Sequence, residues 1–248
     1  MRRPWASGTA TRPSITSTPG SRSPHRRTGG QRISIASRPG FISGVVVGRL
    51  TRRFHAREPV TLARALLGQV LVRVLDDGER LAGRIVETEA YLGVIDRAAH
   101  TYGGRRTPRT ESMWGPAGHA YIYFLYGMHH CMNVVAEGPG QPTAVLIRAL
   151  EPLEGIARMR RHRAGRIPPP RLRDTDLCSG PAKLAQALAL DRHLDGTDLV
   201  DGDRLFLERG RRVRAEDILA GPRIGIAYAG DWALKPLRFT LRGNPHVS

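Results

Sequence analysis

The sequence predicts an α+β domain in which strands dominate, preceded by a long tail of different composition. Strand-like segments recur along residues 54–248 with helical segments between them, but the regular strand–helix–strand order of a parallel sheet is absent. Hydrophobic residues make up 40% of the 248 residues, which is enough to bury a sizeable core. We therefore expect a single globular domain over residues 54–248.

The tail, residues 1–53, consists mostly of Arg, Ser, Thr, Pro and Gly, and it predicts a disordered segment. Such a composition cannot bury enough apolar surface to offset the entropy that is lost on ordering. Residues 1–57 hold twelve Arg but no Asp, Glu or Lys, so only +5 of the net charge of +17 belongs to the rest of the chain. The tail is interpreted as an electrostatic arm for DNA, as a targeting peptide, or as a segment without a function.

The first elements of the domain follow from periodicity. Residues 61–68 predict a short helix, because apolar side chains recur on one face and Gly68 is a stop signal. Alternating apolar residues over 70–75 and 81–91 predict two strands, which an Asp-Asp-Gly turn joins. Residues 92–118 are rich in Gly and Pro and predict a long loop.

The middle of the chain predicts a β-hairpin. Residues 120–126 and 130–136 form two strand-like segments on either side of Gly127, and residues 145–149 predict another strand. We expect a helix that begins near Pro152. The remaining expected elements are a helix capped by Ser179 and strands over 204–208, 223–228 and 237–241.

Composition excludes several classes of protein. No run approaches 18 apolar residues, so a membrane-spanning helix is excluded, and the cationic N-terminus lacks the apolar stretch of a secretory signal. The only cysteines, Cys131 and Cys178, cannot form a disulfide framework and indicate a reducing compartment. Because His129, His130 and Cys131 are consecutive in a strand, they cannot all face one metal ion. We expect neither a metal nor a membrane partner.

Residues 84–91 carry the clearest chemical pattern. In an extended strand Ile85, Glu87, Glu89 and Tyr91 share one face. Two carboxylates and a tyrosine are unusual on a face that packs into a core. One interpretation is a solvated strand face; the other is a carboxylate base beside an aromatic ring that stacks on a substrate.

The predicted hairpin carries a second pattern. Tyr121 and Tyr123 share a face, while Tyr126 precedes Gly127 at the expected tip. Aromatic residues in strands commonly build a core. An exposed Tyr-Gly-Met tip also suits a wedge that is pushed between stacked bases.

From about Phe54 to Ser248 the chain resembles the alkyladenine (3-methyladenine) DNA glycosylases. The resemblance rests on many motifs in the same order, which are LARALLGQVLVR, GRIVETEAYLG, DRAAHTYGGRRTPR, YIYFLYGMHHCMNVV, VLIRALEPLEG, LCSGPAKLAQAL and the terminal KPLRF and RGNPHVS. It implies a single mixed domain with a curved antiparallel β core, a protruding β-hairpin and surrounding helices. The chain departs from the family's pattern at His129 and His130, where bulkier aromatic residues are expected.

The resemblance also assigns roles to individual residues. It implies that Glu89 is the general base that activates water and that Arg148 completes the catalytic site beside the nucleotide's phosphate. The pocket for the flipped base would be formed by Tyr91, His100, Tyr123 and Asn133, and Asn133 would crowd the amino group of normal guanine. Tyr126 and Met128 would insert into the DNA, and Arg105 and Lys183 would contact phosphates.

The implied activity is hydrolysis of the N-glycosidic bond of alkylated purines in double-stranded DNA, without a cofactor. The implied substrates are the 3-methyladenine and 7-methylguanine class, with hypoxanthine as a further candidate. Lys183 and Lys235 are the only lysines, and neither falls in a motif of the pocket, so we expect a monofunctional enzyme that leaves the backbone intact. A monomer in the cytoplasm, associated with the nucleoid, is expected. The alternatives are a nucleic-acid-binding protein without activity and a glycosylase for another base.

Overall fold

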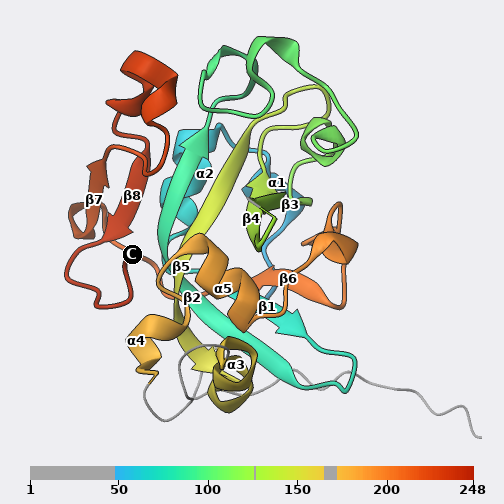
Figure 1. Ribbon diagram of the computed structural model, residues 1–248, viewed down its shortest axis with the longest axis vertical. Coiled ribbons are helices and arrows are strands. Elements are labelled where there is room, and N and C mark those ends of the chain that lie inside the picture. The colour runs from blue at the N-terminus through green and yellow to red at the C-terminus, as the bar shows by residue number, and fades with distance from the viewer. Residues whose placement is uncertain (1–47, 126, 165–171) are drawn as a thin grey trace, which may run out of the picture. The chain divides into compact units, whose positions relative to one another are not determined.

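The structure is a computed structural model that describes residues 48–125, 127–164 and 172–248, and this part of the chain forms an α+β domain (Figure 1). Its strands pair in antiparallel fashion in the order β3-β4-β5-β2-β1-β6, and β8 joins β2 to β7. The strands are β1 (Val70–Val74), β2 (Arg80–Tyr91), β3 (Ala120–Leu125), β4 (His129–Val135), β5 (Ala144–Glu154), β6 (Leu205–Glu208), β7 (Ile218–Gly221) and β8 (Arg238–Leu241).

Helices cover both faces of the central strands. Figure 1 shows α2 behind β2 and β5, and α5 in front of them. Glu58 caps α2 by accepting hydrogen bonds from the backbone N–H groups of Val60 and Thr61, and Pro59 occupies the first helical position. The helices are α1 (Arg52–His55), α2 (Pro59–Leu66), α3 (Ile156–Arg163), α4 (Asp174–Leu177) and α5 (Pro181–Ala187).

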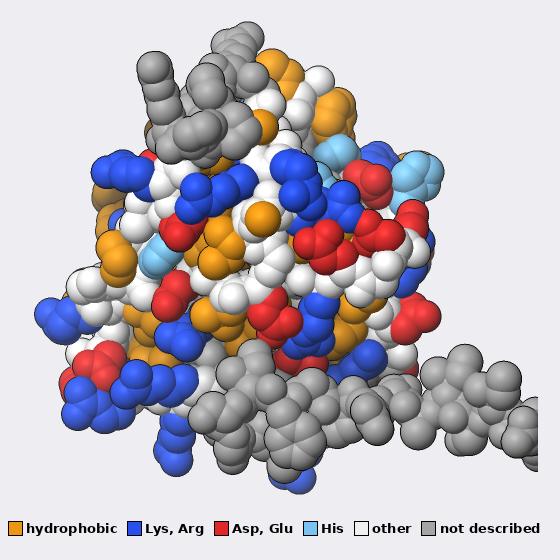
Figure 2. Space-filling model, turned by 90° about the horizontal axis from the view of Figure 1, so that it is seen from below, with side chains coloured by type: hydrophobic (Ala, Val, Ile, Leu, Met, Phe, Trp, Pro, Cys, Tyr) orange, Lys and Arg blue, Asp and Glu red, His pale blue; other side chains and the backbone are white. Residues whose placement is uncertain are grey.

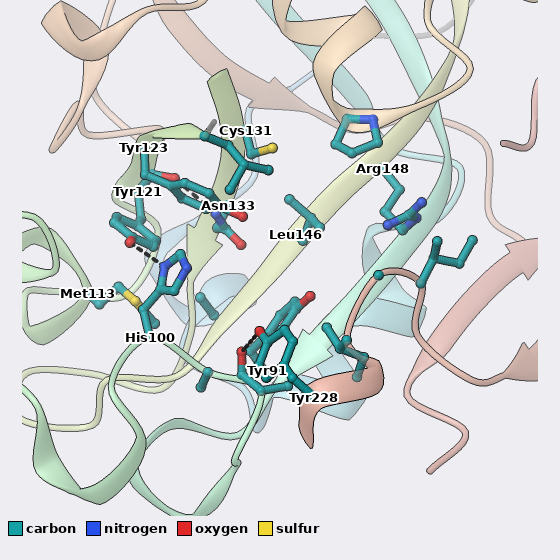
Figure 3. Close-up of a pocket in the computed structure, with 18 residues that line it drawn as sticks. Tyr91, His100, Met113, Tyr121, Tyr123, Cys131, Asn133, Leu146, Arg148 and Tyr228 are labelled. Atoms are coloured by element: carbon teal, nitrogen blue, oxygen red, sulfur yellow. Dashed lines mark hydrogen bonds between the residues drawn. The ribbon is translucent and has the colours of Figure 1, made fainter. Parts of the chain in front are cut away.

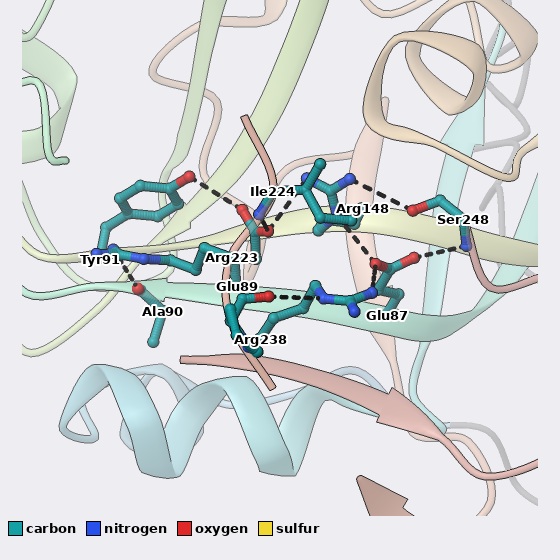
Figure 4. Close-up of polar contacts among 10 residues, drawn as sticks. Glu87, Glu89, Ala90, Tyr91, Arg148, Arg223, Ile224, Arg238 and Ser248 are labelled. Atoms are coloured by element: carbon teal, nitrogen blue, oxygen red, sulfur yellow. Dashed lines mark hydrogen bonds and ion pairs between the residues drawn. The ribbon is translucent and has the colours of Figure 1, made fainter. Parts of the chain in front are cut away.

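The two long strands β2 and β5 position the candidate site. Their pairing shifts register on either side of Glu87, as in a β-bulge. Glu87 and Glu89 nevertheless lie on the same face of β2, away from α2 (Figure 4). On the opposite face, the Thr88 hydroxyl donates to the carbonyl oxygen of Ala63 in α2. The shared face predicted for the two carboxylates is confirmed, but both are fully buried, so a solvated strand face is wrong.

The packed part of the chain begins earlier than residue 54. Leu50 is 1% exposed, and its backbone N–H donates to the carbonyl oxygen of Leu207. The Arg52 guanidinium forms an ion pair with Asp198. Residues 48–53 therefore pack with the domain that was expected to begin at residue 54, a contact that the sequence did not indicate because one buried leucine leaves no periodic pattern. The tail prediction for residues 1–47 lies outside the described residues.

Several predicted elements were wrong at their ends. Pro152 lies within β5, which continues to Glu154, and the following helix begins only after Gly155 adopts a left-handed conformation with φ of 71°. Gly180, not Ser179, occupies the N-cap of α5. The strand expected over 223–228 is an irregular segment that leads into a 3-10 helix, and β7 precedes it. These ends depend on tertiary packing, which local propensity does not encode.

Candidate active site

A pocket of about 290 Å³ lies where the end of β2, the β3–β4 hairpin and the segment 224–228 meet. In Figure 3, His100, Tyr121, Tyr123 and Asn133 line one side, Tyr91 and Tyr228 line another, and Arg148 lies across from them. The volume suits one small planar ligand. The structure thus brings together Tyr91, His100, Tyr123, Asn133 and Arg148 as the sequence predicted.

The aromatic side of the pocket is held in place by its own contacts. His100 Nδ1 lies 2.7 Å from the Tyr121 hydroxyl oxygen, and its ring meets the Tyr123 ring edge to face with centroids 4.6 Å apart. Burial, assisted by the charges of Arg109 and Arg105, lowers the pKa of His100 to about 4. The imidazole is therefore neutral at pH 7, and a cationic ligand meets no charge repulsion from it.

Glu89 lies directly behind the pocket wall. Its Oε2 accepts from the Tyr91 hydroxyl at 3.0 Å, and its Oε1 accepts from the Ile224 backbone N–H at 2.8 Å and lies 3.2 Å from Arg148 Nη1. All three partners line the pocket. Burial raises the pKa of the Glu89 carboxyl, although Arg148, the Ile224 N–H and the Tyr91 hydroxyl oppose the shift. A carboxylate in this setting retains affinity for a proton, as a general base requires.

Arg148 is fixed by the second carboxylate of β2 (Figure 4). Its Nε donates to Glu87 Oε1 at 3.0 Å, and Arg238 Nη1 donates to the same oxygen at 2.9 Å. Glu87 Oε2 accepts from the Ser248 backbone N–H at 2.8 Å, and Ser248 Oγ lies 3.3 Å from Arg148 Nη2. Glu87 thereby orients the guanidinium that faces Glu89.

A buried ion pair positions the segment that contacts Glu89. Arg223 donates to both carboxylate oxygens of Asp96, at 2.5 and 2.9 Å, and neither side chain is exposed. The Arg223 guanidinium also lies 4.7 Å from the centroid of the Tyr91 ring. Arg223 thus holds the Ile224 N–H and the Tyr91 ring on either side of the Glu89 carboxylate.

Sequence reasoning placed Glu87 on the same face as Glu89 but gave it no role of its own, and it missed Ile224, Arg223 and Arg238 as parts of this site. Glu87 and Arg238 were within quoted motifs, so a search for oppositely charged partners among those motifs could have found them. The role of Ile224 rests on a backbone N–H, which no side-chain pattern reveals.

Asn133 lies in the wall beside the aromatic residues. Its Nδ2 donates to the Tyr121 carbonyl oxygen at 3.1 Å, and this hydrogen bond fixes the orientation of the amide. The side chain is 4% exposed and is held by a strand on each side, because β4 pairs with both β3 and β5. Asn133 is therefore a rigid polar group in an otherwise largely apolar wall.

Met128, Arg105 and Lys183 do not line the pocket. Met128, 71% exposed, follows Gly127 at the turn of the hairpin, and Tyr126 lies outside the described residues. Arg105 is exposed on the loop after His100. Lys183, in the first turn of α5, donates to the Ser179 hydroxyl at 3.2 Å. Nothing in these contacts tests their predicted roles toward DNA.

Neither a group of metal ligands nor a membrane-spanning helix occurs in residues 48–125, 127–164 and 172–248. No group of three or more His, Cys, Asp or Glu side chains there gathers as metal ligands would. Within the same ranges, every helix is too short or too polar to span a bilayer.

Comparisons with known proteins agree with this geometry. A family model for methylpurine-DNA glycosylase matches residues 53–245. The DNA-3-methyladenine glycosylases of Mus musculus and Homo sapiens are 51% and 50% identical to the chain over 81% of its length, which corresponds to 61% and 69% of their own lengths. A Clostridium acetobutylicum protein assigned by name to the 3-methyladenine DNA glycosylases is 46% identical over 97% of its length.

The fold, the carboxylate behind an aromatic pocket and the matched motifs define one class of protein. The chain belongs to the methylpurine-DNA glycosylase family. It spans about three fifths of the length of the mouse relative.

Proposed function

We propose that this protein is a DNA glycosylase that releases alkylated purines from double-stranded DNA by hydrolysis of the N-glycosidic bond. The observation that carries the proposal is the Glu89 carboxylate, which is fully buried, held by three donors and separated from an aromatic pocket only by those donors. The substrates would be purines of the 3-methyladenine and 7-methylguanine class. The step belongs to base excision repair, and its products are a free base and an abasic site.

The pocket supports binding of a cationic purine. An N-alkylated purine carries positive charge, which the ring faces of Tyr91 and Tyr123 attract by about 0.5–2 kcal/mol. His100 is neutral near pH 7 and adds a flat surface without repulsion. Because the glycosidic bond is hidden in a duplex, the nucleotide must first rotate out of the stack at a cost of a few kcal/mol. The hairpin tip with Met128 would fill the gap.

The chemical step uses water, Glu89 and Arg148. An ionised carboxylate has about four acceptor positions, and the described donors occupy three of those of Glu89. A water that donates to the fourth gives its proton to Glu89 as its oxygen bonds to the anomeric carbon. The bond from that carbon to the purine breaks, and the electron pair leaves with the base, which neutralises its charge. Arg148, oriented by Glu87, keeps Glu89 aligned.

Neutral lesions such as hypoxanthine lack this favourable leaving group, so we propose that they are released more slowly. Their recognition would depend on hydrogen bonds in the pocket, where Asn133 is the rigid polar group. The same amide would crowd the 2-amino group of undamaged guanine.

The proposal predicts a monofunctional enzyme. Lys235 lies with its amine 3.5 Å from the centroid of the Trp232 ring, Lys183 contacts Ser179, and neither lines the pocket. Because neither lysine amine lies at the site, neither is placed to form a Schiff base with the abasic sugar. We further propose that the protein acts as a monomer on nucleoid DNA, which sizing of the free protein and of its DNA complex would test.

One assay tests the function. Purified protein is incubated with a methylated duplex, and the free base is separated by chromatography, with Glu89→Gln as the control. We expect release of alkylated purines by the wild type, an unbroken strand before alkali treatment, and no trapping by borohydride. Binding without release would favour the inactive binding protein, and release of a pyrimidine instead would favour a glycosylase for another base.

A further inference from the structure

A second groove, of about 540 Å³, opens where β2 changes partners. The first half of β2 pairs with β1 and a later part pairs with β8, so an opening remains between the two neighbouring strands. The segment 211–214, the turn 241–245 and Arg84 line it. The charged residues of the lining are five arginines and one carboxylate. These are Arg84, Arg211, Arg212, Arg214, Arg242 and Asp217.

Positive charge in this groove is only partly compensated. Arg84 pairs with Glu151 at 3.2 Å, and Arg214 pairs with Asp217 at 2.9 Å. Within the described ranges, no carboxylate lies within 4.0 Å of the guanidinium groups of Arg211, Arg212 or Arg242. All three of these side chains are exposed.

Arg214 pairs with Glu216 at 3.4 Å as well as with Asp217, the carboxylate that lines the groove. The pKa of the Asp217 carboxyl lies below its usual value, chiefly because Arg214 donates a hydrogen bond to it, and the charges of Arg242 and Arg211 contribute. Arg84 Nε is buried without a hydrogen-bond partner. On the face seen in Figure 2, acidic and basic side chains lie next to one another.

The groove is connected to the candidate active site by the last residues of the sequence. Asn244, in the groove wall, donates from Nδ2 to Glu151 Oε2 at 3.3 Å, the oxygen that Arg84 contacts. Four residues later, Ser248 contacts Glu87 and Arg148. Figure 1 shows this end of the chain beside β8 and β5. Four residues span at most about 14 Å, and the Val247 N–H donates to the Asn244 carbonyl oxygen in a turn, so Asn244 lies within the length of about four base pairs, at 3.4 Å each, from Ser248.

We propose that Arg211, Arg212 and Arg242 bind the phosphate backbone of the DNA flank, within about four base pairs of the flipped nucleotide. This inference rests on the proposed function, because it assumes that DNA occupies the pocket. Guanidinium groups bind phosphate oxygens in pairs, and such contacts set the position of a protein on DNA without reading sequence. The groove would lengthen the footprint of the enzyme on one side of the lesion.

The test compares binding of three duplexes by Arg211→Ala/Arg212→Ala and wild type. One duplex extends about ten base pairs on both sides of an alkylated purine, and each of the other two ends about two base pairs beyond it on one side. On the long duplex we expect the slope of log Kd against log salt to fall by about two and Kd to rise about tenfold. On one of the shortened duplexes, variant and wild type should bind equally.

A matched control removes the same charge elsewhere. Arg161→Ala/Arg204→Ala deletes two half-exposed arginines that pair with Glu79 and Asp76 near the β1–β2 turn, and it should leave the slope unchanged. Equal slopes for wild type and Arg211→Ala/Arg212→Ala on the long duplex would overturn the proposal. Equal losses on all three duplexes, or equal losses in the control, would also overturn it. Because the readout is binding, a wild type that binds DNA but releases no base would contradict the proposed function and leave this test valid.

Discussion

Glu87 and Glu89 lie two residues apart on one face of β2 and are equally buried, yet their surroundings differ. Glu87 accepts from two guanidinium groups, Arg148 and Arg238, and from a backbone N–H. Glu89 faces one guanidinium, a backbone N–H and a tyrosine hydroxyl, and all three of these line the pocket. One carboxylate is enclosed by positive charge, and the other adjoins the space where a substrate would lie.

This difference in surroundings indicates different roles, one in the stability of the fold and the other in the chemical step. Removal of a buried carboxylate that pairs with two guanidinium groups strongly destabilises the folded protein, because the arginines lose their counter-charge. A buried carboxylate whose pKa is raised opposes folding when it is ionised, since the unfolded chain ionises more readily. We therefore infer that Glu87 stabilises the site and that Glu89 retains its proton affinity at the expense of stability.

The largest effect is expected for Glu89→Gln. The amide keeps the shape but cannot take a proton from water, so single-turnover release of an alkylated purine should fall at least about 100-fold. Stability should be unchanged or higher, because no charge remains to be buried. Excision by chromatography and a urea unfolding curve measure both. Turnover near the wild-type rate would show that another group is the base.

Glu87→Gln should show the opposite pattern. Loss of the charge leaves Arg148 and Arg238 uncompensated, and we expect about 3 kcal/mol less stability in urea unfolding. Excision should fall by about tenfold, since Arg148 is less well oriented but Glu89 is intact. The assignment of stability to Glu87 and of catalysis to Glu89 would be contradicted if this variant were as stable as wild type, or if it excised the base more slowly than Glu89→Gln.

A smaller effect is expected for substitution of Asn133 in the pocket wall, which should change the selectivity between guanine and alkyladenine. Asn133→Ser removes the amide that would crowd the 2-amino group of guanine, so release of mispaired guanine relative to alkyladenine should rise several-fold. Leu146→Ala is the matched control, because it also enlarges the pocket wall but removes no polar group. A ratio that rises equally in both variants would mean that pocket volume, not the amide, excludes guanine.

The smallest effect on the rate is expected from truncation of the N-terminus. Deletion of residues 1–47 should leave stability and single-turnover rate unchanged and should weaken the salt dependence of non-specific DNA binding. Deletion of residues 1–53 also removes the buried Leu50, so it should lower stability by about 1.5–3 kcal/mol. Equal stability of the two truncated proteins would restore the boundary predicted from sequence.

The sequence predicted most of the strands and the members of the pocket for two different reasons. Alternation of apolar residues marks β1 and β2 in the sequence, although both faces of β2 are buried from Ile85 to Ala90. His100, by contrast, lies in an irregular loop, and only the resemblance to a family singled it out. Periodicity failed at 223–228, where Ile224 is held by the Arg223–Asp96 pair and not by a sheet.

The network around Glu87 could not be predicted from the sequence. Its partners Arg148, Arg238 and Ser248 are 61, 151 and 161 residues away along the chain. They meet only because β5 and β8 both pair with β2, on opposite edges. Local patterns report burial, whereas this network depends on topology.

The pH dependence of single-turnover excision by wild type, Glu87→Gln and Glu89→Gln, between about pH 4 and 7, tests the division between the two carboxylates most directly. Activity requires ionised Glu89, so the wild-type rate should fall as pH drops through a pKa above the usual 4.5. His100, with a pKa of about 4, titrates at the lower limit of this range, below the fall expected for Glu89. Glu87→Gln should move the fall to lower pH, because the uncompensated arginines stabilise ionised Glu89. In Glu89→Gln the residual rate should not vary with pH. A wild-type fall centred at or below 4.5, or the same fall retained in Glu89→Gln, would contradict the account.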